Sequence, residues 1–461
     1  MRRKFAAALM GLLGLISATL AHAQEAFDPG LEAYVDGIVH ATMEEHRIVG
    51  LTLSIVDDDR IVMTRGYGYA DWETRRAVDA ERDLFRIGSI TKTFTFTALM
   101  QLVEAGRVDI DADVNTYLDG FRIPDAFGAP ITIRDLLTHR PGFEESVRNV
   151  LTRPEDLAPL REWIAGNIPG RALPPGAQIS YSNYGAALAG YIVEKVSGEP
   201  YEQYIDAHIM RPLQMDSSSA RQVVPGDGAR VLSPALASRV VTGYTLEHNV
   251  FRALPFEVIA ATPAGSISAT APDMARYMLA HLNDGAYLGG RILAPETARL
   301  MRERPYPGHP GPDWDYGFRS GMLAGYDTFE HGGATGAFFA TATMIPELKL
   351  GVFVAVNGAD SPIAQVYIAN DILVRLIGAR ARAEPERVQL TEAQLAHFTG
   401  AYMSTRRSYT QFYKLLSLLG GTENVALTGD GGLRINAEGQ VEDFYPIGPR
   451  SFRGRYRGDV V

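Results

Sequence analysis

The chain contains no cysteine among its 461 residues. Thiol nucleophiles, cysteine-rich zinc sites and disulfide bonds are therefore excluded, and so is a lipid anchor attached to an N-terminal cysteine. Without disulfides the fold depends on its own hydrophobic core. The hydrophobic fraction of 46% and the length are ordinary for a globular protein with such a core, and they allow more than one domain.

Positive charge is also scarce. The net charge is −10, and no run of five or more basic residues occurs, so nucleic acid is not an expected partner. The first residues are typical of a secretory signal, with a basic start at 2–4, an apolar run at 5–20 and a small-x-small cleavage site at 21–23. We therefore expect residues 1–23 to be removed and the protein to be periplasmic or secreted; the alternative is an N-terminal membrane anchor. No later run approaches the roughly 20 apolar residues of a membrane span.

Lysine is the rarest basic residue, with five among 44 lysines and arginines. Lys92 alone has a serine, Ser89, three residues before it. The other four are Lys4, Lys195, Lys349 and Lys414. Arginine does not lose its proton in a protein, whereas a buried lysine can. A lysine in a chain that otherwise prefers arginine suggests that its neutral form is needed, so chemistry is expected first at Ser89 and Lys92.

Strand and helix patterns predict an α+β fold. Apolar, β-branched runs lie near the start and near the end of the chain, at 51–56, 60–64, 337–345 and 350–356. Helical periodicity occurs at 89–105, 273–281 and 366–377. The interval 107–300 is interpreted as mostly helix and loop. We expect one antiparallel sheet built from both ends of the domain, flanked by helices and with an inserted helical subdomain.

The C-terminal part has a different composition. Residues 380–387 are charged and lack apolar periodicity, so they are interpreted as a linker. Short strands joined by turns are expected over 388–461. The predicted organisation is a signal peptide at 1–23, a main domain at 24–379, the linker, and a small β-rich accessory region.

Ser89 and Lys92 are expected at the start of a helix, one turn apart and on the same side. A helix N-terminus presents free N–H groups to a developing oxyanion, and a desolvated lysine can act as the base for a serine nucleophile. The alternative is a helix-capping serine followed by a surface lysine, and this pair alone does not exclude it.

Two further clusters could contribute to the same chemistry. Tyr181 and Asn183 lie on a loop before an apolar helix; a tyrosine there can transfer protons, and an asparagine can orient the lysine and a substrate amide. His331, Gly333 and Ala334 precede the late strands, where glycine allows close approach of a substrate and the Ala334 N–H could donate to an oxyanion. Taken separately, each cluster also fits a capped loop or a turn.

Together the three clusters, Ser-x-x-Lys, Tyr-x-Asn and His-x-Gly, resemble the class C β-lactamase and penicillin-binding-protein superfamily of serine hydrolases. The resemblance runs from about residue 30 to about 380. Linking segments that look like the family lie at 136–142, 263–268 and 316–318, and residues 398–402 are similar to the start of a small C-terminal β-barrel domain of some members.

The resemblance implies a role for each matching residue. Ser89 would be acylated, Lys92 and Tyr181 would share the proton transfers, and Asn183 would orient Lys92 and the substrate. The N–H groups of Ser89 and Ala334 would form the oxyanion hole. His331 and Gly333 would line the strand side of the cleft.

The third motif departs from the β-lactamases, which usually have lysine at the position of His331. Histidine is mostly neutral at pH 7 and offers no fixed charge to a β-lactam carboxylate. We therefore expect an exported peptidase or esterase of this family, acting on an ester, D-amino-acid peptide or β-lactam carbonyl of a small molecule or peptide, without a metal or other cofactor. A true class C-type β-lactamase and a non-hydrolytic receptor for penicillin or peptidoglycan fragments remain alternatives.

Other residues suggest chemistry less strongly. His139 and Asp135 could belong to a Ser-His-Asp triad, but no Gly-x-Ser-x-Gly motif accompanies them. Residues 57–59, three aspartates, are interpreted as a turn and not as a metal site. Glu144 and Glu145 follow a Pro-Gly turn and are expected to face solvent.

Overall fold

The computed structural model describes residues 29–146, 149–306, 314–383, 385–412, 414–415, 422–437 and 440–454. The chain divides into two compact units, Met1–Ala41 and Thr42–Val461. Helix α2 (Pro29–Glu45) begins in the first unit. The expected signal at 1–23 lies outside the described residues. Within the described ranges, no helix has both the length and the apolar character to cross a membrane.

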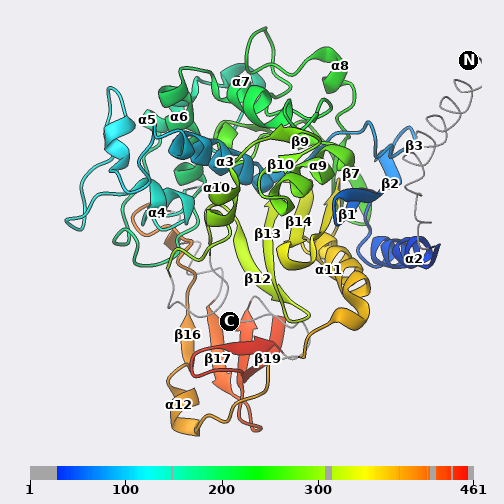
Figure 1. Cartoon of the computed structure of the whole chain (residues 1–461), viewed down its shortest axis with the longest axis vertical. Coiled ribbons are helices and arrows are strands. Elements are labelled where there is room, and N and C mark those ends of the chain that lie inside the picture. The colour runs from blue at the N-terminus through cyan, green and yellow to red at the C-terminus, as the bar shows by residue number, and fades with distance from the viewer. Residues whose placement is uncertain are drawn as a thin grey trace, which may run out of the picture. The chain divides into compact units, whose positions relative to one another are not determined.

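Seven antiparallel strands form the main sheet, in the order β12-β13-β14-β15-β1-β2-β3 (Figure 1). The strands are β1 (Gly50–Asp57), β2 (Arg60–Asp71), β3 (Arg76–Ala77), β12 (Arg319–Leu323), β13 (Tyr326–Ala334), β14 (Phe339–Ile345) and β15 (Leu350–Val356). The early strand β1 pairs with the late strand β15, with Leu53 opposite Val354. The prediction of a sheet built from both ends of the domain is therefore confirmed. Asp58 and Asp59 form the turn between β1 and β2, and Asp57 is the last residue of β1.

Helices cover both faces of the centre of this sheet. Every residue of β15 is buried, which requires cover on both faces because successive side chains alternate. Helices α9 (Ala271–Leu282) and α11 (Ala364–Ile377) both contact β15. The continuous apolar run of β15 is the sequence counterpart of this double cover.

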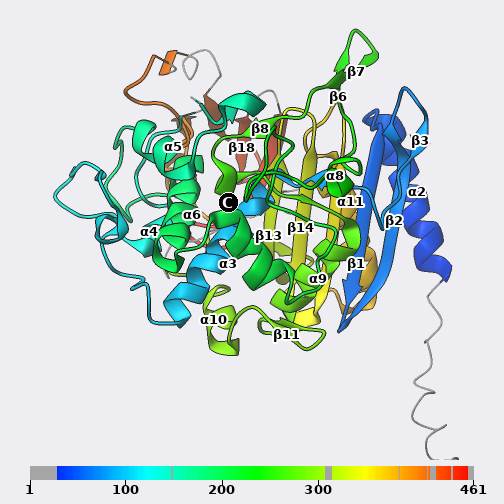
Figure 2. The same ribbon diagram turned by 90° about the horizontal axis from the view of Figure 1, so that it is seen from above.

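The inserted region contains most of the remaining helices, and Figures 1 and 2 show α3 to α6 gathered beyond the β12 side of the sheet. Its helices are α3 (Thr91–Glu104), α4 (Ile133–Leu137), α5 (Leu160–Gly166), α6 (Asn183–Ser197), α7 (Tyr201–Ile205), α8 (Pro234–Ala237) and α10 (Pro295–Leu300).

The interpretation of 107–300 as mostly helix and loop missed short paired strands. They are β4 (Phe85–Arg86) with β9 (Ser268–Ala269), β5 (Leu151–Thr152) with β8 (Val258–Ile259), β6 (Gly243–Glu247) with β7 (Val250–Leu254), and β10 (Ala286–Tyr287) with β11 (Gly290–Arg291). Most of these strands have two residues, which is too short to carry a periodic pattern, whereas β6 and β7 have five residues each.

Helix α3 is buried on every side through its first ten residues, Thr91 to Met100. Its threonine hydroxyls avoid the cost of burial by hydrogen bonding. Thr93 donates to the carbonyl of Ile90 at 2.8 Å, and Thr95 lies 2.7 Å from the hydroxyl of Tyr201. The start of α3, where chemistry is expected, therefore lies in the protein interior.

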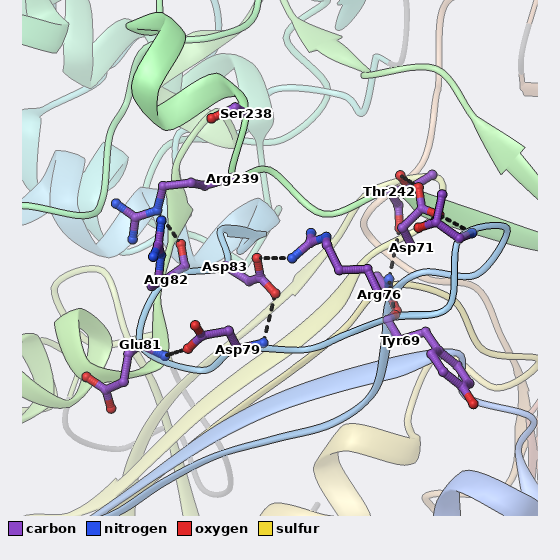
Figure 3. Close-up of polar contacts among 12 residues, drawn as sticks. Tyr69, Asp71, Arg76, Asp79, Glu81, Arg82, Asp83, Ser238, Arg239 and Thr242 are labelled. Atoms are coloured by element: carbon purple, nitrogen blue, oxygen red, sulfur yellow. Dashed lines mark hydrogen bonds and ion pairs between the residues drawn. The ribbon is translucent and has the colours of Figure 1, made fainter.

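A polar network holds the segment that leads from the main sheet to this helix (Figure 3). Asp83 is 2% exposed, pairs with Arg76 at 2.7 Å and accepts the Asp79 N–H at 2.8 Å. Arg239 donates to the carbonyl of Arg82 at 2.6 Å. Because the buried carboxylate is paired and hydrogen-bonded, it fixes the chain a few residues before Ser89.

The C-terminal region is a five-stranded antiparallel sheet in sequence order, and this confirms the β-rich prediction. Its elements are α12 (Glu392–Ala396), β16 (Gly400–Tyr402), β17 (Glu423–Leu427), β18 (Leu433–Ala437), β19 (Gln440–Pro446) and β20 (Phe452–Gly454). It has a separate hydrophobic cluster of Leu395, Leu433, Phe444 and Phe452. The linker at 380–387 and the domain boundaries stay predictions.

Candidate active site

Packing of α3 against α6 brings two of the three clusters together. Ser89 lies on a 3₁₀ turn, Gly88–Ile90, and Lys92 follows in the first turn of α3. The Lys92 Nζ lies 2.9 Å from Ser89 Oγ and 2.7 Å from the carbonyl oxygen of Ala264. The amine is therefore in hydrogen-bond contact with the hydroxyl that it would activate.

Lys92 is fully buried, and burial lowers its pKa well below the ordinary value. The charge of Arg406 lowers the pKa further, while Glu145 opposes the change. Desolvation disfavours the charged ammonium, so the amine is held toward its neutral form. A neutral amine can accept the proton of a serine hydroxyl, which a lysine with an ordinary pKa cannot do at pH 7.

Tyr181 faces the same pair from the start of α6. Its ring centre lies 4.9 Å from Lys92 Nζ. Burial raises the pKa of Tyr181 to about 12, and a hydrogen bond to Ser89 offsets part of the rise. The phenol therefore keeps its proton near neutral pH, so Lys92 is the better base and Tyr181 the better proton donor.

Asn183 differs from the expectation. It is the first residue of α6, after Ser182, which caps the helix by accepting the Gly185 N–H at 3.0 Å. In the described part of the chain no hydrogen bond joins the Asn183 side chain to Lys92; the carbonyl of Ala264 holds the amine instead. The expected contact of Asn183 with a substrate amide stays a prediction.

Strand β13 brings the third cluster against the serine turn. A Cβ atom at Gly88, whose φ is +50°, would lie 2.7 Å from the Ala334 nitrogen. A Cβ at Gly333 would lie 1.9 Å from the Ile87 carbonyl oxygen and 3.1 Å from the Ser89 nitrogen. Only glycine permits this approach. The backbones that carry the two expected oxyanion donors, Ser89 and Ala334, therefore lie side by side.

His331 lies on β13 and is 2% exposed. Burial and the neighbouring Lys92 lower its pKa to about 3, although a hydrogen bond to the Gly332 carbonyl, at 2.5 Å from Nδ1, acts in the other direction. The imidazole is therefore neutral at physiological pH, as expected from its type. The strand contributes no permanent charge at this position.

Aromatic residues that the sequence analysis did not select surround Tyr181. The ring of His139 lies 4.3 Å from the Tyr181 ring, and that of Trp314 lies 5.1 Å from it. The triad alternative is wrong, because Asp135 forms a capping box with Thr132. His139 instead accepts the Ser182 N–H at 3.4 Å and supports the tyrosine loop.

The expectation that Glu144 and Glu145 face solvent is also wrong. Glu144 is 1% exposed, and the side chain of Glu145 is 12% exposed. Residues from the C-terminal region cover both, and one of them, Arg406, lies with its guanidinium 4.6 Å from the centre of the Tyr181 ring. No local pattern could reveal this contact, because 261 residues separate Glu145 from Arg406.

These residues line an open cleft of about 470 Å³. Ser89, Tyr181, His331 and Ala334 lie on its walls together with Arg406. The volume suits a small molecule or the end of a peptide. Among the described residues, no group of three or more histidine and carboxylate side chains could hold a metal ion.

A family model for Beta-lactamase matches residues 35–375. The chain belongs to the beta-lactamase family. The chain is similar to "Penicillin-binding protein 4" of Amycolatopsis lactamdurans. The two are 28% identical over 369 residues, which cover 78% of this chain and 91% of the relative. The resemblance inferred from the three motifs is confirmed at the level of family and fold.

Solved structures agree with the beta-lactamase family fold. The octameric penicillin-binding protein homologue from Pyrococcus abyssi matches with a TM-score of 0.64 and 25% identity, covering 93% of this chain and 94% of that one. EstCE1, described as a hydrolase with promiscuous acyltransferase activity, matches with a TM-score of 0.60 and 21% identity over 71% of this chain and 97% of that one. The match to the P. abyssi homologue covers more of the chain than the family model does.

Proposed function

We propose that the protein is an exported serine hydrolase that forms an acyl-enzyme on Ser89 and cleaves an ester or a D-amino-acid peptide. The observation that carries the proposal is the buried amine of Lys92, 2.9 Å from Ser89 Oγ, with a lowered pKa. A neutral amine at that distance is a general base that needs neither histidine nor carboxylate. Export to the periplasm or beyond is proposed from residues 1–23 alone.

The proposed reaction has two acyl-transfer steps. Ser89 Oγ attacks the carbonyl carbon while its proton passes to Lys92, and the Ser89 and Ala334 N–H groups stabilise the oxyanion. The bond to the leaving group breaks as Tyr181 donates a proton to the leaving group, consistent with its raised pKa, and Tyr181 recovers a proton from protonated Lys92. Water then attacks the acyl-enzyme and gives a proton to Lys92. The ester bond to Ser89 breaks, and this proton passes to Ser89 Oγ, which frees the acid product and restores the enzyme.

The neutral state of His331 favours ester or peptide substrates over β-lactams in this proposal. A β-lactamase usually has a lysine there, and an imidazole with a pKa of about 3 does not replace its charge. The description of EstCE1 as a hydrolase with acyltransferase activity is consistent with acyl-enzyme chemistry on this fold, although its 21% identity supports the fold alone.

A substrate panel tests the proposal. Purified protein is incubated with a short-chain aryl ester, a D-Ala-D-Ala peptide and a chromogenic cephalosporin, and turnover is followed in parallel with covalent labelling detected by intact-protein mass. We expect turnover of the ester or the peptide and a transient acyl mass on the wild type.

The matched control is Ser89→Ala, which removes one oxygen from a buried turn. We expect it to lose all acylation and turnover while unfolding like the wild type. Acylation of Ser89→Ala would refute the assignment of the nucleophile. Stable labelling of the wild type by penicillin without turnover of any substrate would support a receptor instead.

A further inference from the structure

A segment of the C-terminal region, residues 403–410, is attached to the catalytic cleft by several hydrogen bonds. The buried carboxylate of Glu144 accepts the N–H groups of Tyr409 and Thr410, both at 2.7 Å, and the Thr410 hydroxyl at 2.6 Å. The Thr405 hydroxyl donates to the carbonyl of Ile179 at 2.6 Å, two residues before Tyr181. The segment is therefore fixed beside the proposed proton donor.

Arg406 lies in the middle of this segment and reaches the cleft. Its guanidinium lies 4.6 Å from the centre of the Tyr181 ring, and its Nε donates to Glu145 at 2.5 Å. The side chain is 49% exposed and lines the same cleft as Ser89. A group held on one side by a carboxylate and on the other by an aromatic face is oriented before a ligand arrives.

Arg406 differs from the other basic side chains of the cleft in its charge and in its hydrogen bonds. His331 and Lys92 are held toward their neutral forms. Arg319 also lines the cleft, but it pairs with Glu330 on the adjacent strand at 3.3 Å. Arg406 stays charged at every physiological pH, and its bond to Glu145 engages one of five N–H groups, so the terminal nitrogens remain to donate to a ligand.

We propose that Arg406 binds a carboxylate of the substrate, so that the preferred acyl substrates carry a negative charge a short distance from the scissile carbonyl. This inference rests on the proposed function and narrows its substrate class. The cation of this site comes from the C-terminal region and does not replace a charge at the β13 position of His331, which is neutral. A guanidinium matches a carboxylate with two parallel hydrogen bonds, which gives both affinity and orientation.

Two aryl esters with the same leaving group test the inference: 4-nitrophenyl butyrate, which is neutral, and mono-4-nitrophenyl glutarate, which carries a carboxylate. The readout is the ratio of kcat/KM for the charged ester to that for the neutral ester. Because both are measured on the same variant, a change in the basicity of Lys92 affects both and cancels. We expect Arg406→Gln to lower this ratio about 10- to 100-fold, mainly by raising KM for the charged ester. A loss of this size corresponds to the loss of a charge-assisted hydrogen bond.

Arg406→Lys and Arg319→Gln are the matched variants. Lysine keeps the charge but not the paired geometry, so an intermediate ratio is expected. Arg319→Gln removes the other cation of the cleft and should change the ratio less than Arg406→Gln does. An unchanged ratio in Arg406→Gln, or a larger loss in Arg319→Gln, would overturn the inference.

Binding of glutarate to Ser89→Ala by calorimetry separates this inference from the proposed function, because it does not require turnover. We expect binding that the added Arg406→Gln change weakens about tenfold or more. Absence of binding, or binding that Arg406→Gln does not weaken, would overturn the carboxylate site. Arg406-dependent binding without hydrolysis of either ester would support the site and contradict the hydrolase.

Discussion

At the scale of single residues, burial assigns different protonation states to groups that the sequence only places in order. Burial lowers the pKa of Lys92 and so favours its neutral amine, and burial raises the pKa of Tyr181 and so favours its protonated phenol. The residues next to Lys92 and Tyr181 in the sequence do not indicate either pKa shift. The assignment of Lys92 as the proposed base and Tyr181 as the proposed acid therefore rests on their environment and not on the motif alone.

Arg406→Gln should shift the pH profile of neutral ester hydrolysis. The charge of Arg406 lowers the pKa of Lys92, so its removal raises that pKa and more of the amine is protonated at a given pH. The acid limb of kcat/KM for 4-nitrophenyl butyrate should move to higher pH. Arg319→Gln is the control, and coincident acid limbs for wild type and Arg406→Gln would contradict the electrostatic coupling.

At the scale of secondary-structure elements, α9 carries a titratable group in the core. His281 is 2% exposed on α9, and burial together with Arg302 lowers its pKa to about 3. Its ring packs 5.0 Å from the ring of Phe318. Below the ordinary pKa of 6.5 the unfolded chain binds a proton that the folded chain rejects, so stability falls as the pH falls from about 6.5 toward 3.

His281→Asn should flatten this dependence. Asparagine takes up no proton when the chain unfolds. For each unit by which the pH falls, the unfolding free energy of the variant should therefore decrease by up to about 1.4 kcal/mol less than that of the wild type. Urea denaturation at pH 7, 6 and 5 measures both proteins. The buried His331 remains in each and keeps some slope. Parallel curves would show that His281 is not held neutral in the fold.

The contact between Glu144 and the 403–410 segment makes a second prediction at this scale. Burial raises the pKa of Glu144, but hydrogen bonds from Thr410, Tyr409 and Gly170 outweigh it and leave the pKa lowered, so the carboxylate is charged and bound. Glu144→Ala removes the acceptor of these bonds and leaves buried donors without a partner. Trypsin should then cleave after Arg406 or Arg407 several-fold faster than in the wild type.

An exposed glutamate provides the comparison for this proteolysis. Glu155 has a 59% exposed side chain and only a 3.7 Å contact with Arg153. Glu155→Ala should leave cleavage of the segment unchanged. Equal cleavage rates in Glu144→Ala and the wild type would mean that Thr405 and the backbone contacts hold the segment without Glu144.

At the scale of the whole molecule, the C-terminal region has a hydrophobic cluster separate from the large cluster that includes Phe94 of α3 and Leu188 of α6. Phe444 belongs to the small C-terminal cluster and is 7% exposed. Phe444→Ala should destabilise the C-terminal sheet by about 3 kcal/mol, as expected for truncating a buried phenylalanine. Differential scanning calorimetry should show a lower transition for this region, with the transition of the catalytic domain unchanged.

The same variant links stability to selectivity. If the C-terminal sheet positions Arg406, Phe444→Ala should reduce the preference for the charged ester at temperatures where this sheet unfolds, while hydrolysis of the neutral ester continues. If Phe444→Ala shows one unfolding transition, shifted as a whole to lower temperature, the two hydrophobic clusters do not unfold separately and this prediction is wrong.

The sequence indicated the main sheet and the long helices, because continuous apolar strands such as β15 and periodic helices such as α9 carry a strong local pattern. It did not reveal the two-residue strands, and two pairs of them, β4 with β9 and β5 with β8, depend on partners more than 100 residues away. It placed Glu144 and Glu145 in solvent because a carboxylate after a Pro-Gly turn is usually solvated, and only a distant segment could cover them.

The sequence by itself determined the family and the β-rich character of the C-terminal region, and it predicted the pair of Ser89 and Lys92, because each depends on residue types at short spacing. Only the tertiary structure decided that Ala264 holds Lys92 and that Arg406 enters the cleft. These outcomes depend on burial and on contacts between segments far apart in the chain, and hydrogen-bond partners and desolvation exist only after the chain has folded.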